Sequence, residues 1–325
     1  MSFPRLSILV PFYNVESYFE RCIRSLMEQT IPERVEYIFI NDGSSDRSYE
    51  VLMQTLSDYP AKNEFVRVYQ HGHNLGIAAT KADCIKLAQG EYIGWCDADD
   101  WCDPEMFERL YNTAIQTGAD IVACNHYFEE KGSRIEGISL YTNNKEDVLD
   151  NLHTRKDYFF PLWDTVMRRS LLIDNDIYPY SGVNIAEDVN VFLRAAYYAN
   201  RIVKLPDFLY HYNKDNVNSM TQRELDDLDA RWAQNKKNTD SMCAFFLTKD
   251  PRRFRIMCNY LKFCMKFHNR VAIGSLYNYF NTYRESHRDI LKYSSFPLSL
   301  RIKWRIIYFN LLTFRLYGLY SRLKR

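Results

Sequence analysis

Residues 90–104 read Gly-Glu-Tyr-Ile-Gly-Trp-Cys-Asp-Ala-Asp-Asp-Trp-Cys-Asp-Pro. The apolar run from Tyr92 to Cys96 predicts a short buried strand, which leads directly into the acidic turn that contains Asp97 and Asp99. Pro104 then favours the start of a helix, because the first helical position does not need the N–H that proline lacks. The stretch therefore predicts a strand–turn–helix unit of an α/β fold, with a ligand site at the carboxyl end of the strand.

The acidic turn suits a hard divalent cation. Crowded carboxylates repel one another unless a cation or hydrogen-bond donors offset their charge. Mg²⁺ and Mn²⁺ take one or two carboxylates when the phosphates of a substrate complete their coordination. Asp97 and Asp99 therefore predict a site for a diphosphate bound through Mn²⁺ or Mg²⁺. The alternative is that Asp99, Asp100 and Asp103 only cap the helix that Pro104 opens.

Three earlier segments repeat the order strand, loop, helix. Their predicted strands are Leu6–Val10, Val35–Ile40 and Val66–Tyr69. Strands that alternate with amphipathic helices predict a parallel sheet covered on both faces. Since the loops follow the carboxyl ends of parallel strands, we expect four loops to meet at one edge of the sheet.

The loops at this edge carry side chains suited to a nucleotide. Tyr13 could stack on a base, Asp42 could accept a hydrogen bond from a uracil imide or a ribose hydroxyl, and Lys81 could contact phosphate or base. The structural alternatives are a packed aromatic at Tyr13 and a helix cap in the second loop. Neither G-x-G-x-x-G nor G-x-x-x-x-G-K-[ST] occurs, so the phosphate loops of the dinucleotide and P-loop folds are absent from the sequence.

Five motifs, in this order and spacing, resemble the family 2 glycosyltransferases of bacterial cell-surface polysaccharide synthesis. They are Ser7–Asn14, Ile40–Asp46, Asn74–Gly76, Ala88–Ile93 and Asp97–Asp100. One such motif is weak evidence, whereas five in register are specific. The resemblance covers about residues 5–220 and implies an α/β GT-A fold: a mostly parallel, Rossmann-like sheet flanked by helices. It also implies an enzyme that moves a sugar from a nucleotide-sugar, most often a UDP-sugar.

The resemblance assigns roles to the donor side position by position. It implies that Asp99 binds the cation and that the nucleotide-sugar is contacted by Pro11, Tyr13, Asp42, Lys81, Asp97 and Ala98. The family usually has Arg where this chain has Lys81, and a lysine is a point charge without the bidentate fork of arginine.

A second acidic centre opens a later apolar helix. The resemblance implies that Asp188 is the general base of an inverting transfer and that Glu187 contacts the acceptor. It places Trp163 on the acceptor side, stacked on a sugar. The structural alternatives are an ordinary acidic helix N-terminus and a core tryptophan.

Residues 209–220 resemble the family loop that closes over the diphosphate. An Arg is common there, and this chain has Lys214, which we expect to supply the cationic contact. Ser219 is a further nucleotide-sugar contact, and His211 a metal or phosphate contact. The alternative for His211 is a histidine that is hydrogen-bonded within a strand.

Length and composition set the outer limits. The chain has 325 residues, of which 46% are hydrophobic and 15% aromatic, enough for a large core. Eight cysteines lack the spacing of a zinc site, and the first apolar run is too short for a signal peptide. No apolar run approaches the length of about 18 residues that a spanning helix needs. We therefore expect a cytoplasmic protein, peripheral on the inner face of the membrane.

The sequence predicts a catalytic domain over residues 1–222 and a helical region over 223–325. Apolar residues at helical spacing predict helices over Leu225–Leu247, Pro251–Phe267, Ala272–Leu291 and Pro297–Leu323, with a break at Asp250–Pro251. No acidic residue follows Asp289, and residues 297–325 are predicted to form a basic amphipathic helix. Such a helix suits an anionic membrane surface; the alternatives are docking on protein and, least favoured, nucleic-acid binding, so we expect no nucleic-acid partner.

The leading functional hypothesis is an inverting, metal-dependent glycosyltransferase. Its acceptor would be a hydroxyl of a carbohydrate or a lipid-linked oligosaccharide in surface polysaccharide synthesis. A sugar-phosphate nucleotidyltransferase would show a Gly-rich, Arg-containing loop after the first strand, and Pro11–Asn14 is not such a loop. The non-catalytic alternative is a nucleotide-sugar-binding or membrane-scaffolding relative, against which the retained Asp97, Asp99 and Asp188 argue.

Overall fold

The computed structural model describes residues 4–32, 34–150, 152, 160–217, 219, 228–268 and 282–283. The chain divides into two compact units. The first comprises Met1–Val148 and Tyr158–Glu224, and the second comprises Leu149–Asp157 and Leu225–Arg325.

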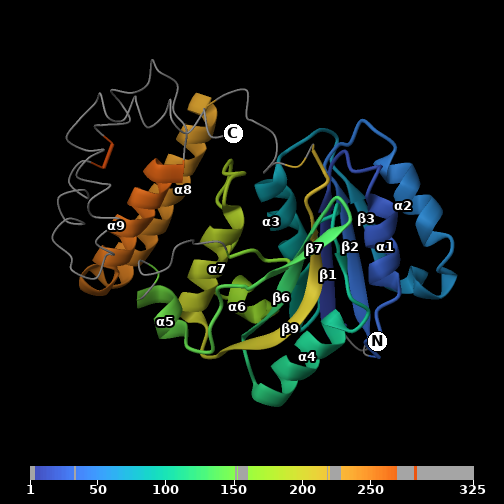
Figure 1. Cartoon of the computed structure of the whole chain (residues 1–325), viewed down its shortest axis with the longest axis horizontal. Helices are drawn as coiled ribbons and strands as arrows, with labels where there is room; N and C mark the ends of the chain where they lie inside the picture. The colour runs from blue at the N-terminus through green and yellow to red at the C-terminus, as the bar shows by residue number, and fades with distance from the viewer. Residues whose placement is uncertain are drawn as a thin grey trace. The chain divides into compact units, whose positions relative to one another are not determined.

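A nine-stranded sheet forms the centre of the first unit, in the order β3-β2-β1-β4-β8-β6-β9-β5 with β7 paired to β6 (Figure 1). Its parallel half consists of β1 (Leu6–Phe12), β2 (Val35–Asn41), β3 (Val66–Gln70) and β4 (Tyr92–Trp95). The other half is mixed and consists of β5 (Trp101–Cys102), β6 (Ile121–Glu130), β7 (Ser133–Gly137), β8 (Thr165–Arg168) and β9 (Ile202–Asn213). The α/β fold with a largely parallel first half is the one that the sequence predicted.

Helices α1 (Phe19–Met27), α3 (Ile77–Leu87), α4 (Met106–Thr117) and α6 (Arg169–Ile173) pack on strands of this sheet. The described chain between β1 and β9 also contains α2 (Ser48–Leu56), α5 (Lys145–Asp150), α7 (Glu187–Tyr198) and a 3₁₀ helix over Pro60–Phe65. In α1 the buried positions 19, 22, 23, 26 and 27 follow the helical period, so one face packs inward. Helix α4 ends at Gly118, whose φ of 66° provides the left-handed cap that favours glycine.

The order of the parallel strands creates a crevice. Strands β2 and β3 lie on one side of β1 and β4 lies on the other, so the chain reverses its direction of winding between β1 and β4. Ligands of open α/β sheets bind at the carboxyl ends of the strands at such a switch point. The loop after β1 and the acidic turn after β4 flank this crevice.

The strands beside the crevice are rigid supports. Every residue of β1, β2 and β4 is buried, as expected for parallel strands covered on both faces. A side chain at Gly94 would lie 2.5 Å from the ring of Phe107, so glycine lets α4 pack directly on β4.

Two helices of the second unit are described: α8 (Leu228–Lys249) and α9 (Pro251–His268) (Figure 1). The predicted break at Asp250–Pro251 is confirmed, because Asp250 Oδ1 accepts the N–H groups of Arg252 and Arg253 at 2.9 Å each. The helices predicted over 272–291 and 297–323 lie outside the described residues, apart from positions 282 and 283.

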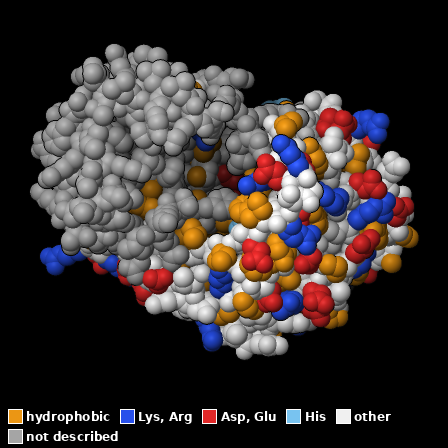
Figure 2. All heavy atoms as spheres, viewed as in Figure 1, with side chains coloured by type: hydrophobic (Ala, Val, Ile, Leu, Met, Phe, Trp, Pro, Cys, Tyr) orange, Lys and Arg blue, Asp and Glu red, His pale blue; other side chains and the backbone are white. Residues whose placement is uncertain are grey.

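None of the helices in the described ranges has the length and apolarity needed to cross a bilayer. Figure 2 shows acidic and basic side chains intermixed over the described face of the molecule, in keeping with a formal net charge of +1.

Candidate active site

The acidic turn after β4 is held by the end of β9. Asp100 is 1% exposed; its carboxylate accepts the Tyr210 hydroxyl and the Asn213 N–H, both at 2.7 Å. The Tyr210 hydroxyl also accepts the N–H of Asp97 at 3.1 Å. Burial raises the pKa of Asp100 well above its usual value. Asp100 is therefore an anchor of the turn, and its neighbours Asp97 and Asp99 remain as the candidate ligands.

Asp99 is tied to the segment that follows β9. Its Oδ2 accepts the Asn216 amide at 2.7 Å, and its backbone carbonyl accepts the Asn213 amide at 3.1 Å. Among the described residues, Asn216 is the one whose side chain donates to this carboxylate. Burial raises the pKa of Asp99, and the bond from Asn216 opposes the rise. The helix-cap alternative is wrong, because α4 begins at Met106 and no side chain caps it.

Acids from two distant segments meet beside this turn. The Lys81 ammonium lies 2.8 Å from Glu187 Oε1 and 2.5 Å from Asp188 Oδ1. Burial raises the pKa of Asp97 to about 8; Lys81 opposes the rise, while Asp188 and Asp99 add to it. Burial likewise raises the pKa of Glu187 to about 7, against the attraction of Lys81. Asp97, Glu187, Asp188 and Lys81 therefore form one electrostatic group, which we call the acid cluster.

The structure gives Lys81 a different partner from the predicted nucleotide. The residue is 2% exposed and its ammonium is bonded to the Glu187–Asp188 pair. Burial lowers the pKa of Lys81, but the carboxylates of Asp188, Glu187 and Asp97 outweigh burial and hold that pKa well above its usual value. Lys81 is therefore a buried cation of the acid cluster.

The loop before α7 sets the position of the acid pair. Ala186 precedes α7 in the left-handed conformation with a φ of 53°, which is uncommon for a residue other than glycine. Asn184 Oδ1 accepts the N–H of Ala78 at 3.1 Å, so this loop is fastened to the first turn of α3. No side chain caps α7, so the two carboxylates serve the ion pair with Lys81 and not a cap.

Asp42 links two loops of the nucleotide edge. Its Oδ1 lies 2.8 Å from His71 Nδ1 and accepts the N–H of Leu75 at 2.9 Å, and its Oδ2 accepts the N–H of Gly76 at 2.9 Å. The buried carboxylate thus shapes the loop before α3. Sequence reasoning assigned it only to the nucleotide and missed this structural role.

The loop after β1 presents the other predicted nucleotide contacts. Pro11 is a buried residue of β1, and Tyr13 is 40% exposed at its end, so the ring is available for stacking. Ala98 lies buried in the acidic turn. Asn14 ties this loop to the second loop, because its Oδ1 accepts the N–H of Ser45 at 2.8 Å.

Trp163 is a packed core residue and His211 is hydrogen-bonded within its strand, so both match the structural alternatives and not the predicted ligand contacts. Trp163 is 2% exposed and stacks on Tyr210 with ring centroids 4.3 Å apart, so its faces are covered by protein and not offered to a sugar. His211 Nδ1 lies 2.8 Å from Glu129 Oε1, and Nε2 lies 3.0 Å from Asp103 Oδ1. With both ring nitrogens engaged, His211 has no atom left for a metal ion.

Lys214 and Ser219 lie in the segment after β9, which ends at Asn213. The Lys214 ammonium lies 4.5 Å from the centre of the Phe128 ring, and the Ser219 N–H donates to the Asn216 carbonyl at 3.0 Å. Asn213 and Asn216, which bind the acidic turn, were not singled out from the sequence. The polar run that follows the last strand was their only signal.

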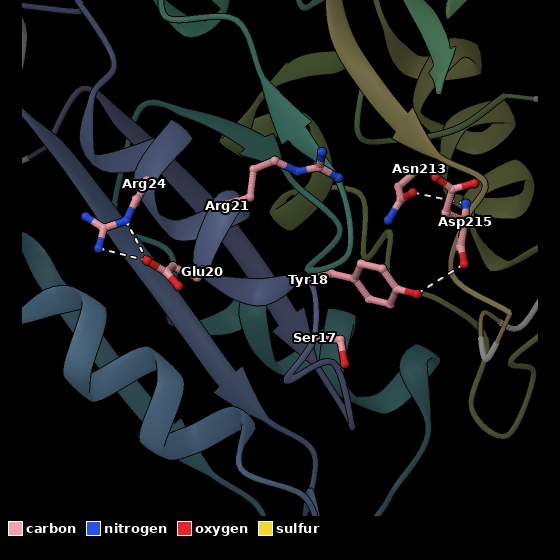
Figure 3. Close-up of a pocket in the computed structure, with 7 residues that line it drawn as sticks. All are labelled: Ser17, Tyr18, Glu20, Arg21, Arg24, Asn213 and Asp215. Atoms are coloured by element: carbon pink, nitrogen blue, oxygen red, sulfur yellow. Dashed lines mark hydrogen bonds and ion pairs between the residues drawn. The ribbon is translucent and has the colours of Figure 1, made fainter. Parts of the chain in front are cut away.

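A pocket of about 570 Å³ lies beside the acidic turn (Figure 3). It is lined by Ser17, Tyr18, Glu20, Arg21, Arg24, Asn213 and Asp215. The Tyr18 hydroxyl closes one side by donating to the Asp215 carbonyl at 3.1 Å. Asn213 lines the pocket and also donates hydrogen bonds to Asp99 and Asp100 of the acidic turn. None of the residues that line the pocket belongs to the acid cluster.

Comparison with known proteins agrees with this geometry. Residues 7–174 match the family model described as Glycosyl transferase family 2. EpsJ of Bacillus subtilis (strain 168), an uncharacterized glycosyltransferase, is 34% identical over 226 residues, which span 67% of this chain and 63% of EpsJ. The chain thus spans less than two thirds of the length of this relative.

Two solved structures share the fold. TarS 1-349 of S. aureus, in complex with UDP-GlcNAc, superposes with a TM-score of 0.65 at 19% identity and covers 87% of this chain and 81% of its own. The mannosyltransferase PcManGT of Pyrobaculum calidifontis, in complex with GDP-Man and Mn²⁺, has a TM-score of 0.56 at 15% identity. The match covers 95% of this chain and 84% of the PcManGT chain. At these identities the likeness establishes the GT-A fold alone. Together with the family match, which covers more than half of the chain, it shows that this protein is a family 2 glycosyltransferase with a GT-A fold.

Proposed function

We propose that this enzyme transfers a sugar, with inversion, from a UDP-sugar to a hydroxyl of a carbohydrate or lipid-linked oligosaccharide acceptor in surface polysaccharide synthesis. The observation that carries the proposal is the meeting of Asp97 and Asp99 with Glu187 and Asp188 around one edge of the sheet. An inverting transfer needs a cation, held by a carboxylate, beside the departing diphosphate and a carboxylate base beside the attacking hydroxyl. Asp99 would serve the first purpose and Asp188 the second.

The donor would lie across the switch point between β1 and β4. Tyr13 is exposed for stacking on the base, Pro11 supports that loop from within β1, and Asp42 shapes the loop before α3. Asp97, Ala98, Lys214 and Ser219 would complete the contacts to ribose and diphosphate. The UDP-GlcNAc complex of TarS, which has the same fold, supports a UDP-sugar as the donor.

Asp188 would act as the general base. It accepts the proton of the acceptor hydroxyl while the hydroxyl oxygen bonds to the anomeric carbon. The bond between that carbon and the diphosphate oxygen breaks, and the nucleoside diphosphate leaves with the electron pair. Glu187, adjacent on α7 and bonded to the same lysine, would contact the acceptor.

The residues present fit a divalent cation. The carboxylates of Asp97, Glu187 and Asp188 surround the Lys81 ammonium, and burial raises the pKa of Asp97, Asp99 and Glu187, so a bound cation that stabilises their ionised forms would be favoured here. We propose that Asp99, through the oxygen not bonded to Asn216, would hold Mn²⁺ or Mg²⁺ together with the donor phosphates. Bound there, the cation would stabilise the charge on the departing diphosphate. Within the described ranges no three His, Cys, Asp or Glu side chains enclose a metal, which agrees with a site completed by the substrate.

The experiment that tests the function is release of UDP from a panel of UDP-sugars with Mn²⁺. We expect the wild type to turn over at least one donor and Asp188→Asn to lose activity by about 10²- to 10⁴-fold, the usual contribution of a general base. Glu50→Gln, at an exposed acid on α2, is the matched control and should retain wild-type activity. An active Asp188→Asn variant would contradict the assignment of the base.

The division into a catalytic domain over 1–222 and a helical region over 223–325 remains a proposal, as does membrane attachment at the inner face. The charge pattern of residues 297–325, outside the described residues, supports attachment to anionic lipid. Deleting these residues should abolish partition onto anionic vesicles; unchanged partition would count against it.

A further inference from the structure

We propose, on the basis of the function above, that Lys81 is a positioning residue: its buried ammonium binds Glu187 and Asp188 together as a clamp and keeps the base oriented. In this view the partner of Lys81 in the reaction is the acid pair and not the nucleotide. The role is separate from the donor contact that lysine or arginine would make with a phosphate.

The contacts of the ammonium carry the first step. A lysine ammonium has three hydrogen-bond donors, and here two of them go to Glu187 and Asp188. Because the ammonium is almost fully buried, it cannot exchange these carboxylates for water without rearrangement. The two acids are neighbours in sequence on α7, so one cation from α3 restrains both.

A second contact joins α3 to the loop before α7. Asn184, in the loop before α7, bonds the N–H of Ala78, which lies three positions before Lys81 and therefore on the same helix face. The side chain of Asn184 also fits against Gly76, where an added Cβ would lie 2.5 Å from it. Ala186 lies between these two contacts in the left-handed conformation. A residue other than glycine keeps this conformation only where the surrounding contacts fix its backbone.

The charges around Asp188 explain why a clamp is needed. It is faced by Lys81 from α3, Glu187 on its own helix, Asp97 after β4 and the Tyr141 phenol from the segment after β7. Of these only Lys81 is positive. Removing the ammonium leaves the carboxylates to repel one another, which frees the side chains of Glu187 and Asp188 to rotate.

The test compares Lys81→Met and Lys81→Arg with wild type, and Lys86→Met, an exposed lysine of the same helix, as control. We expect Lys81→Met to lower kcat by more than about tenfold while the donor KM changes by less than about threefold. Lys81→Arg, which keeps the positive charge, should restore part of kcat. A weakened donor KM with an unchanged kcat would overturn the proposal and favour a nucleotide contact.

A second measurement does not depend on activity. Denaturant unfolding of Lys81→Met, Asp188→Asn and the double variant forms a thermodynamic cycle. If the clamp exists, the double variant is less destabilised than the sum of the single variants, because either single change leaves the other partner uncompensated. Additive effects would overturn the clamp. If the cycle shows coupling but no UDP-sugar is turned over by the wild type, the proposed function fails while the clamp stands.

Discussion

Replacing Asp42 tests whether its carboxylate shapes the loop before α3 or serves only the nucleotide. In the structure this buried side chain accepts the backbone N–H groups of Leu75 and Gly76 and lies 2.8 Å from His71 Nδ1. Asp42→Ala leaves two backbone donors and an imidazole without their acceptor. Each unpaired buried donor costs about 1 to 3 kcal/mol, and water that enters the space offsets part of the loss, so we expect a destabilisation of about 3 kcal/mol.

The conservative change should cost less. Asp42→Asn can keep its carbonyl oxygen toward His71 and Leu75 and would then place its amide nitrogen against the Gly76 N–H. With one lost bond the expected cost is about 1 to 2 kcal/mol. Glu50→Gln, on the exposed face of α2, controls for the loss of a charge and should remain within about 0.5 kcal/mol of wild type.

The assay is urea unfolding of each variant, followed by calorimetric titration with UDP and Mn²⁺. We expect stability to decline in the order wild type, Asp42→Asn, Asp42→Ala, with UDP affinity declining in the same order because the loop loses its shape. If Asp42→Ala unfolds like wild type while UDP binding disappears, the carboxylate is a nucleotide ligand alone and the argument from its hydrogen bonds is refuted.

Three further predictions follow from the site. Asp99→Asn should abolish the Mn²⁺-dependent part of the rise in melting temperature caused by UDP; a rise that persists would place the cation elsewhere. Burial raises the pKa of Glu187 from 4.5 to about 7, so the folded state binds the proton of this group more tightly than the unfolded state does. The free energy of unfolding should therefore fall as the pH rises from about 4.5 to 7, by on the order of 1 to 3 kcal/mol. Glu187→Gln should remove most of this fall, and denaturant titrations across this pH range that show the same fall in the variant would contradict the assignment. Trp163→Ala should destabilise the first unit by about 3 to 5 kcal/mol because it empties a packed aromatic site, whereas a change only in the acceptor KM, with normal stability, would return Trp163 to the acceptor side.

Much of this protein follows from local pattern in the sequence. Three strand–loop–helix units are followed by a fourth strand that leads into the acidic turn. This repeated order already predicts a parallel α/β sheet with its loops on one edge. Such elements are decided by residues close together in the chain, through hydrophobic period and turn chemistry. For that reason the first four strands and the break at Asp250–Pro251 agree with the structure to within one or two residues.

The partners of the polar side chains were decided only by the tertiary structure. Lys81 was expected at the nucleotide and lies against Glu187 and Asp188, over one hundred positions away. Asn216 binds Asp99 across a similar distance in sequence. The side chains of Trp163 and His211 suit either a ligand contact or a buried structural position, and in the structure both are buried.

The physical reason is the range of the forces involved. Backbone conformation and amphipathic period act over a few residues, so the order of elements is legible along the chain. A buried charge or hydrogen-bonding group must be matched by whatever the fold brings within about 3 Å of it, and that neighbour is set by strand order and by the crossing of α3 with the loop before α7.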